Sequence, residues 1–137
     1  MLSIALGAAL LLRGLVPTQA ADPTEVALAR CLDDPANAST AGQTGCEGAA
    51  ERAYDRRMNT AYAALLRALA PEAATRLRQA QRSWIAFRDA DTRARSALFA
   101  TRQGTMYVPM QAGSTTGVVR DRALQLETDL RILRIDD

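Results

Sequence analysis

The sequence predicts an all-α fold: an antiparallel helical bundle of three long helices plus a short N-terminal helix, with one disulfide. Apolar residues recur at spacings of three and four, the period of one helix face, and alternating strand patterns are almost absent. Pro23, Pro71 and Gly104 fall between the periodic segments, where helices begin or end. At 137 residues the chain is long enough for one domain with a modest core.

The first 20 residues have the features of a secretory signal peptide. An apolar run covers residues 4–12, and small residues lead to Ala20, after which we expect cleavage. A membrane anchor is the alternative, but the run is far shorter than the roughly 20 apolar residues that span a bilayer. Arg13 follows the run instead of preceding it, which is unusual for a signal. We expect residues 21–137 to form a single helical domain, periplasmic or secreted, without a membrane span.

The charge of the chain is nearly balanced. It has 17 basic residues, all arginine, and 15 acidic residues. Arg13 is the only charge in the first 20 residues, so the rest has 16 arginines against 15 acids, or +1. This balance argues against a nucleic-acid partner. Because the chain has no histidine, a serine such as Ser83 has no imidazole base, and we expect no enzyme activity.

Cys31 and Cys46 are the only cysteines. In an exported chain an even count predicts a disulfide, and two cysteines allow one intramolecular pairing. Closing a loop of about 15 residues is worth on the order of 3 kcal/mol. A zinc site is the alternative, but two cysteines without histidine cannot fill four positions. We expect neither a metal nor any other cofactor.

Four helices are expected from the apolar period. Thr40 begins the second, because Gln43 lies three residues on and can complete a capping box. An irregular loop precedes the last. The expected bounds are about residues 24–32, 40–70, 71–102 and, for the last helix, 118 onward, with Pro109 as the earliest start.

Each long helix carries a stripe that we expect to form the core. The stripe of the second helix continues backwards to Asp55 and Glu51, and Asp91 falls on that of the third. The charge-rich residues 52–57 and 88–96 are expected to be solvated helix faces. The predicted core residues are Met58, Tyr62, Leu65 and Leu69, then Leu77, Trp84, Phe87, Ala94 and Leu98, then Val119, Ala123, Leu126, Leu130 and Leu133.

Polar residues lie among the apolar ones where the second and third helices meet. A tight connection at Pro71 makes these helices antiparallel, so residues equidistant from it face each other, and Asp55 lies within a turn of Arg88. Half-buried charges need partners, and we predict a structural polar network. Its members are Asp55, Asn59, Tyr62, Gln81, Trp84, Arg88 and Asp91. The alternative is an accessible cleft lined by Asp55, Arg88 and Asp91.

Two loops are candidates for binding a partner protein: residues 37–44, tethered by the disulfide, and residues 104–110. The second contains Met106 and Tyr107, with Arg102 at its edge. Exposed side chains of these kinds are enriched at protein interfaces. The alternative is that Met106 and Tyr107 pack over the end of the bundle.

In chain order, these residues form a recognisable pattern. It comprises Cys31, Thr40 and Cys46, then Asp55-x-x-Met58-Asn59-x-x-Tyr62-x-x-Leu65, then Gln81-x-x-Trp84-x-x-Phe87-Arg88-Asp89, then Gly104-Thr105-Met106 and Arg122-x-x-x-Leu126. The pattern resembles the LprI-type domain of exported bacterial proteins, a family named for a mycobacterial lipoprotein that inhibits lysozyme. The resemblance covers about residues 28–130.

The sequence departs from this family in two ways. Many members carry a second cysteine pair, and the named protein has a lipid-attachment cysteine; both are missing here. The resemblance implies an exported binding protein whose partner is lysozyme or another envelope protein, and it transfers no inhibitory residue. The alternative is a periplasmic envelope or stress protein, without catalysis, that binds peptidoglycan, a small ligand or a partner protein.

Overall fold

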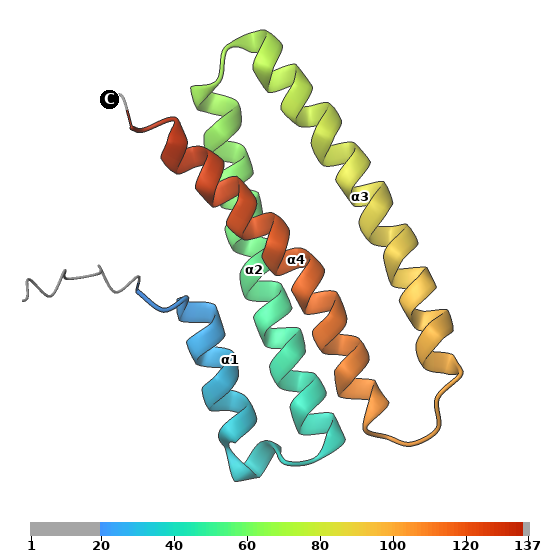
Figure 1. The fold of residues 1–137 in the computed structure, drawn as a ribbon. Coiled ribbons are helices and arrows are strands. Elements are labelled where there is room, and N and C mark those ends of the chain that lie inside the picture. The colour runs from blue at the N-terminus through green and yellow to red at the C-terminus, as the bar shows by residue number, and fades with distance from the viewer. Residues whose placement is uncertain (1–19, 136–137) are drawn as a thin grey trace, which may run out of the picture.

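The computed structural model describes residues 20–135, and the predicted signal peptide lies almost wholly outside them. The elements are α1 (Pro23–Asp33), the short 3-10 helix η1 (Pro35–Asn37), α2 (Thr40–Ala68), α3 (Pro71–Ala100) and α4 (Tyr107–Ile132) (Figure 1). The predicted fold class is confirmed: three long helices follow a short one, and a disulfide joins the first two helices. None of the described helices is both long and apolar enough to cross a membrane.

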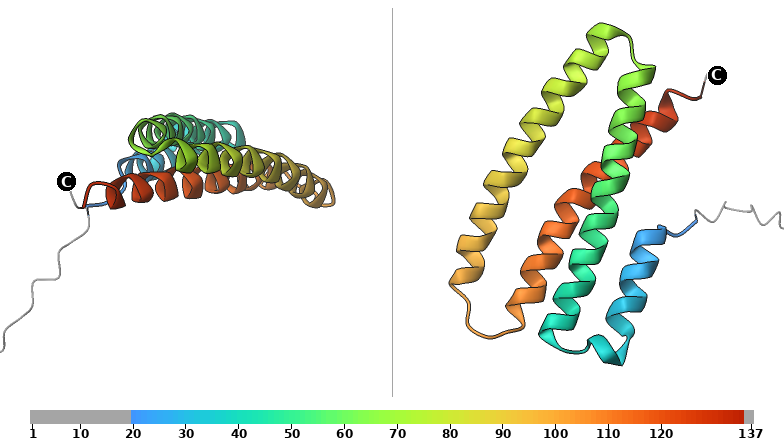
Figure 2. Two further views of the ribbon diagram at one scale, coloured as in Figure 1. Left: turned by 90° about the horizontal axis from the view of Figure 1, so that it is seen from above. Right: turned by 180° about the vertical axis from the view of Figure 1, so that it is seen from behind.

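α2 and α4 run together through the middle of the molecule. Figure 1 shows α1 on one side of this pair and α3 on the other. Seen from above, α1 and α4 lie on the same side of α2 (Figure 2). α3 diverges from α2 after the connection at residues 69–70, so it is an outer helix. The core is therefore built mainly by α2 and α4.

The predicted stripes on α2 and α4 form this core, except at Leu133, which follows the end of α4 and is 38% exposed. Met58 and Leu65 from α2 pack with Val119 and Leu126 from α4, and all four are buried. The predicted backward extension of the α2 stripe is wrong by one position, because the fully buried residue there is Tyr54 rather than Asp55. The other core and flanking residues are Ala61 and Ala123, with the partly buried Tyr62, Leu69, Leu77, Trp84 and Leu130.

The predicted stripe on α3 is correct only near the connection to α2. Leu77 and Trp84 pack against the core, but Phe87 is 57% exposed and Leu98 is 55% exposed, and Ala94 is exposed too. The physical reason is the divergence of α3, which leaves its flank without a neighbour along the second half of the helix. Placing Phe87, Ala94 and Leu98 in the core was therefore wrong.

The predicted start of α2 at Thr40 is confirmed, but its predicted capping residue and the predicted start of α4 are wrong. The side chain of Ser39, not Thr40, caps α2 by accepting a hydrogen bond from the Gly42 N–H (3.0 Å). α4 begins at Tyr107, two residues before Pro109. The turn that precedes it uses Gly104 at φ 109°, a left-handed conformation that favours glycine.

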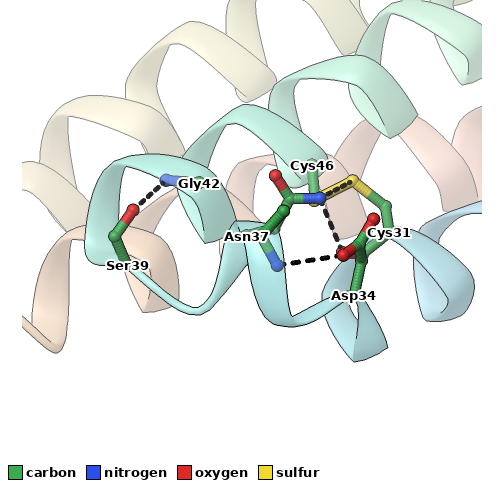
Figure 3. Close-up of a disulfide and its surroundings, with 7 residues drawn as sticks. Cys31, Asp34, Asn37, Ser39, Gly42 and Cys46 are labelled. Carbon is green, nitrogen blue, oxygen red and sulfur yellow. Dashed lines mark hydrogen bonds between the residues drawn. A yellow bond between two sulfur atoms is a disulfide. The ribbon is translucent and has the colours of Figure 1, made fainter.

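The disulfide fastens the turn between α1 and α2. Cys31 and Cys46 have Cα atoms 5.7 Å apart. The side-chain amide of Asn37 donates a hydrogen bond to the Cys31 carbonyl (3.0 Å), as Figure 3 shows. Gly42 must lack a side chain, because a Cβ there would come within 2.7 Å of the Asn37 backbone. The predicted pairing is confirmed, and it holds α1 against the first turns of α2.

Candidate functional site

Gln81, Trp84 and Arg122 join α3 to α4. The buried Gln81 side chain accepts a hydrogen bond from Arg122 Nε (2.9 Å), and its amide nitrogen lies 3.8 Å from the sulfur of Met58 on α2. The Trp84 ring lies beside two guanidinium groups, with the Arg88 carbon 5.4 Å and the Arg122 carbon 5.9 Å from the ring centroid. These are cation–π distances. Two members of the predicted network, Gln81 and Trp84, thus lie at the junction of three helices.

Arg122 is the most deeply buried charge of this junction. Its residue is 8% exposed, and its Nη1 donates to the side-chain oxygen of Gln125 (2.8 Å). Within residues 20–135 its Nη2 has no hydrogen-bond partner. Burial lowers the pKa of this guanidinium, and the charges of Asp129 and Tyr62 only partly oppose that effect. The protein therefore holds a cation here with neutral amides.

The charged members of the predicted network bond within their own helices. Asp55 accepts a hydrogen bond from the Asn59 amide (3.0 Å), and both lie on α2. Two further pairs, both on α3, are Arg88 with Asp89 and Asp91 with Arg95. None of these hydrogen bonds joins α2 to α3. The remaining predicted member, Tyr62, packs against the core.

Asp55 and Arg88 nevertheless line one open hollow of about 510 Å³ between α2, α3 and α4. Glu51 and Thr92 also contribute to its walls. Two residues of the cleft that the sequence offers as an alternative, Asp55 and Arg88, therefore line the same hollow. Asp91 is not part of this lining.

A polar cluster around Arg57 was not predicted. Its guanidinium binds Glu127 of α4 through two hydrogen bonds of 2.7 Å and Asp22 at the start of α1 at 2.9 Å. Asp22 also caps α1 and accepts a hydrogen bond from the hydroxyl of Tyr54 (3.1 Å). Arg57 lies within the stretch 52–57 that was expected to be a solvated face, and that expectation is wrong for it: its side chain is 23% exposed.

The cluster changes the ionisation of its members. Burial alone would raise the pKa of Asp22, but hydrogen bonds from Arg57, the Glu25 amide and Tyr54 outweigh it and lower that pKa. Hydrogen bonding to Glu127 raises the pKa of Arg57 against the opposing effect of burial. Burial and the hydrogen bond to Asp22 raise the pKa of Tyr54. These charges join α1, α2 and α4.

The two predicted loops lie at the same end of the molecule, where the chain turns from α1 into α2 and from α3 into α4 (Figure 1). Met106 is 62% exposed, and Val108 and Met110 are also exposed. Tyr107 is half-buried in the first turn of α4, and Arg102 is exposed in the loop before it. Met106 and Met110 border a hollow of about 440 Å³. Large apolar side chains thus gather at this end of the bundle.

The described residues supply no group of histidine, cysteine and carboxylate side chains that could hold a metal. What residues 20–135 do offer is an exposed apolar end, a charge-lined hollow, and buried polar contacts between the helices.

Comparisons with known proteins give the chain its family. The profile of the family described as lysozyme inhibitor LprI matches residues 31–126. A crystal structure of an uncharacterized protein from Burkholderia thailandensis superimposes with a TM-score of 0.79 and is 32% identical in sequence, covering 85% of this chain and 57% of that chain. No curated protein matches. This chain spans only part of the length of that protein. The family profile, however, matches most of this chain, which therefore belongs to the LprI lysozyme inhibitor family.

Proposed function

We propose that this chain is an exported protein that binds lysozyme and inhibits it. The observation that carries the proposal is the family match over residues 31–126, which reaches from the disulfide to the core of α4. The Cys31–Cys46 bond supports export, because disulfides persist in oxidising compartments. Residues 1–20 act as the signal peptide in this proposal, and residues 21–137 form the exported domain.

We assign partner binding to the end of the bundle that carries the Cys31–Cys46 disulfide and residues 101–106 between α3 and α4, which we call the disulfide end. Met106 is large, apolar and exposed, as side chains at the centre of protein interfaces are before binding. The cleft of a glycoside hydrolase contains two carboxylates, and Arg102, exposed in the loop that leads to Met106 and the half-buried Tyr107, provides a cation. Covering that cleft blocks the substrate, so inhibition requires no catalysis by this chain.

The test is calorimetric titration of the mature, oxidised chain with a c-type lysozyme, together with an assay of bacterial lysis. We expect binding and loss of lysis. Arg102→Ala and Met106→Ala should weaken both while leaving the helical content unchanged, because both side chains are exposed. Arg76→Ala, an exposed position on α3, is the matched control. Absence of binding at tens of micromolar would remove lysozyme as the partner.

A second candidate is binding of a small polar ligand, favoured by the hollow that Asp55 and Arg88 line. Trp84 is the only tryptophan and lies beside Arg88, so its fluorescence reports on this region. Quenching by soluble peptidoglycan fragments in the wild type, but not in Arg88→Gln, would support this function. Unchanged emission at millimolar concentrations of the fragments would exclude it for that ligand class.

A further inference from the structure

The hollow at the disulfide end is a groove with apolar walls and a polar floor. Leu32 of α1 forms one side, and Met106, Pro109 and Met110 at the start of α4 form the other. Gln43 and Glu47 of α2 supply the polar part of the lining, which we call the floor. Its volume is about 440 Å³, within the range of sites that take a side chain or small ligand.

Glu47 of α2 provides the charge on this floor. It is half-buried, and its carboxylate lies against Gly113, where a Cβ would come within 3.1 Å of Glu47 Oε1. The backbone carbonyl of Glu47 accepts a hydrogen bond from the Thr116 hydroxyl (3.1 Å). The side-chain carboxylate of Glu47, however, accepts no hydrogen bond from any group of residues 20–135. Two other half-buried carboxylates, those of Asp22 and Glu127, are both paired with Arg57.

This combination selects the chemistry of an occupant. An apolar side chain would fit the walls but would cover an unpaired carboxylate, which is costly. An anionic group would be repelled. Lysine and arginine combine an aliphatic stem with a cationic head, and methionine side chains adapt to such stems. The head can form a charge-assisted hydrogen bond with the carboxylate, which is among the stronger contacts available.

We propose that this groove receives one lysine or arginine side chain of the partner protein, with the stem between Leu32 and Met110 and the cationic head on Glu47. The inference rests on the proposed function in that the partner is a protein bound at the disulfide end. It adds a recognition residue, Glu47, and assigns to Gly113 the role of leaving the carboxylate accessible.

Glu47→Gln tests the charge without changing the size of the side chain. We expect affinity for lysozyme to fall about tenfold or more, because the partner's cation loses the carboxylate that it would bind. Glu51→Gln is the matched control: it lies one turn further along α2, is also half-buried, and lines the other hollow. Equal affinities of wild type, Glu47→Gln and Glu51→Gln would overturn the proposal while leaving lysozyme binding intact.

Gly113→Ala provides a second variant that should fold at least as well as the wild type. An alanine in a helix is favoured over glycine by roughly 0.5–1 kcal/mol. Its Cβ would push the Glu47 carboxylate by a few tenths of an ångström or cover it. We expect unchanged or higher thermal stability together with several-fold weaker binding of lysozyme. Binding as tight as that of the wild type would count against the role of Gly113.

The groove can also be tested if lysozyme does not bind. The probes are N-acetyl-lysine methylamide and N-acetyl-arginine methylamide, with the norleucine analogue as a control that has the stem without the charge. We expect the ¹⁵N–¹H signal of Gly113 to shift with the two cationic probes in the wild type and to stay in place in Glu47→Gln. Failure of both cations to shift it at tens of millimolar would refute the groove as a cation site, whatever the partner.

Discussion

Arg57 offers the sharpest test of what holds the helices together. Its side chain binds Glu127 of α4 and Asp22 of α1, and its Nη1 also donates to the hydroxyl of Thr24 (3.0 Å). Arg57→Met keeps most of the aliphatic stem and removes every one of these hydrogen bonds. The carboxylates of Asp22, at the start of α1, and of Glu127, on α4, then lose the cation that they share. We expect this single change to be among the most destabilising at any charged residue of the described chain.

The magnitude follows from the exposure of the three side chains. Removing one partner of a fully buried ion pair costs about 3–5 kcal/mol, whereas an exposed pair contributes about 0–1 kcal/mol. The side chains of Arg57, Asp22 and Glu127 are between 23% and 25% exposed, so water can partly rehydrate the two carboxylates. We therefore expect a loss of about 2–3 kcal/mol, out of the roughly 5–15 kcal/mol that stabilises a domain.

Urea unfolding at pH 7, followed by helical circular dichroism, measures this loss. Arg76→Met is the matched control, because Arg76 forms an exposed pair with Glu72 on one helix and should cost less than about 0.5 kcal/mol. A double-mutant cycle of Arg57→Met with Glu127→Gln then isolates their coupling energy. If Arg57→Met and Arg76→Met lose the same stability, the cluster is not what joins α1, α2 and α4.

Three other predictions concern the remaining contacts. Replacing Cys31 and Cys46 together by serine should lower the free energy of unfolding by about 3 kcal/mol in urea, in line with a closed loop of this length; a change below 1 kcal/mol would contradict it. Gln81→Leu should cost about 2 kcal/mol, because Arg122 Nε loses its buried acceptor, and adding Arg122→Leu should recover part of that loss. Since the pKa of Asp22 is lowered by folding, its contribution is present above its ordinary pKa near 3.8 and disappears as the pH falls below it; urea midpoints of Asp22→Asn should therefore fall less steeply between pH 4 and 2 than those of the wild type.

Most of the core could be predicted from spacing because α2 and α4 each bury the central part of one stripe. Met58 and Leu65 repeat at helical spacing on α2, as do Val119 and Leu126 on α4, and each stripe faces the other along its length. For a central helix, the apolar period therefore identifies the buried face. The same period set both ends of α2 to within two residues, but it missed the first turns of α4, which begins at Tyr107 and not at the expected residue 118.

The period was insufficient on α3 because this helix has neighbours on only one side. Its contacting face carries Gln81 and Trp84, while Phe87 and Leu98 lie on a flank that α3 leaves open as it diverges. The repeat of apolar residues cannot indicate where a helix loses its neighbour. That information depends on the angle between helices, which side-chain packing at their connection determines.

The Arg57 cluster was missed for a different reason. Arg57 follows Tyr54 by three residues, so its place on the buried side of α2 was visible in the spacing. Its partner Glu127 lies 70 residues away. No local pattern pairs two such residues, and charged residues at helical spacing are usually solvated. The general signal is a charge on an apolar stripe, which predicts a partner without identifying it.

The disulfide connects the stability of the fold with the proposed recognition of the partner. Each cysteine is followed directly by a residue of the groove: Leu32 after Cys31, and Glu47 after Cys46. A bond that holds the two Cα atoms at 5.7 Å therefore also fixes the apolar wall relative to the charge on the floor. Recognition groups bind best when their geometry is set before binding. Reduction should then weaken partner binding even where α2 and α4 remain folded, because the core of those two helices does not include α1.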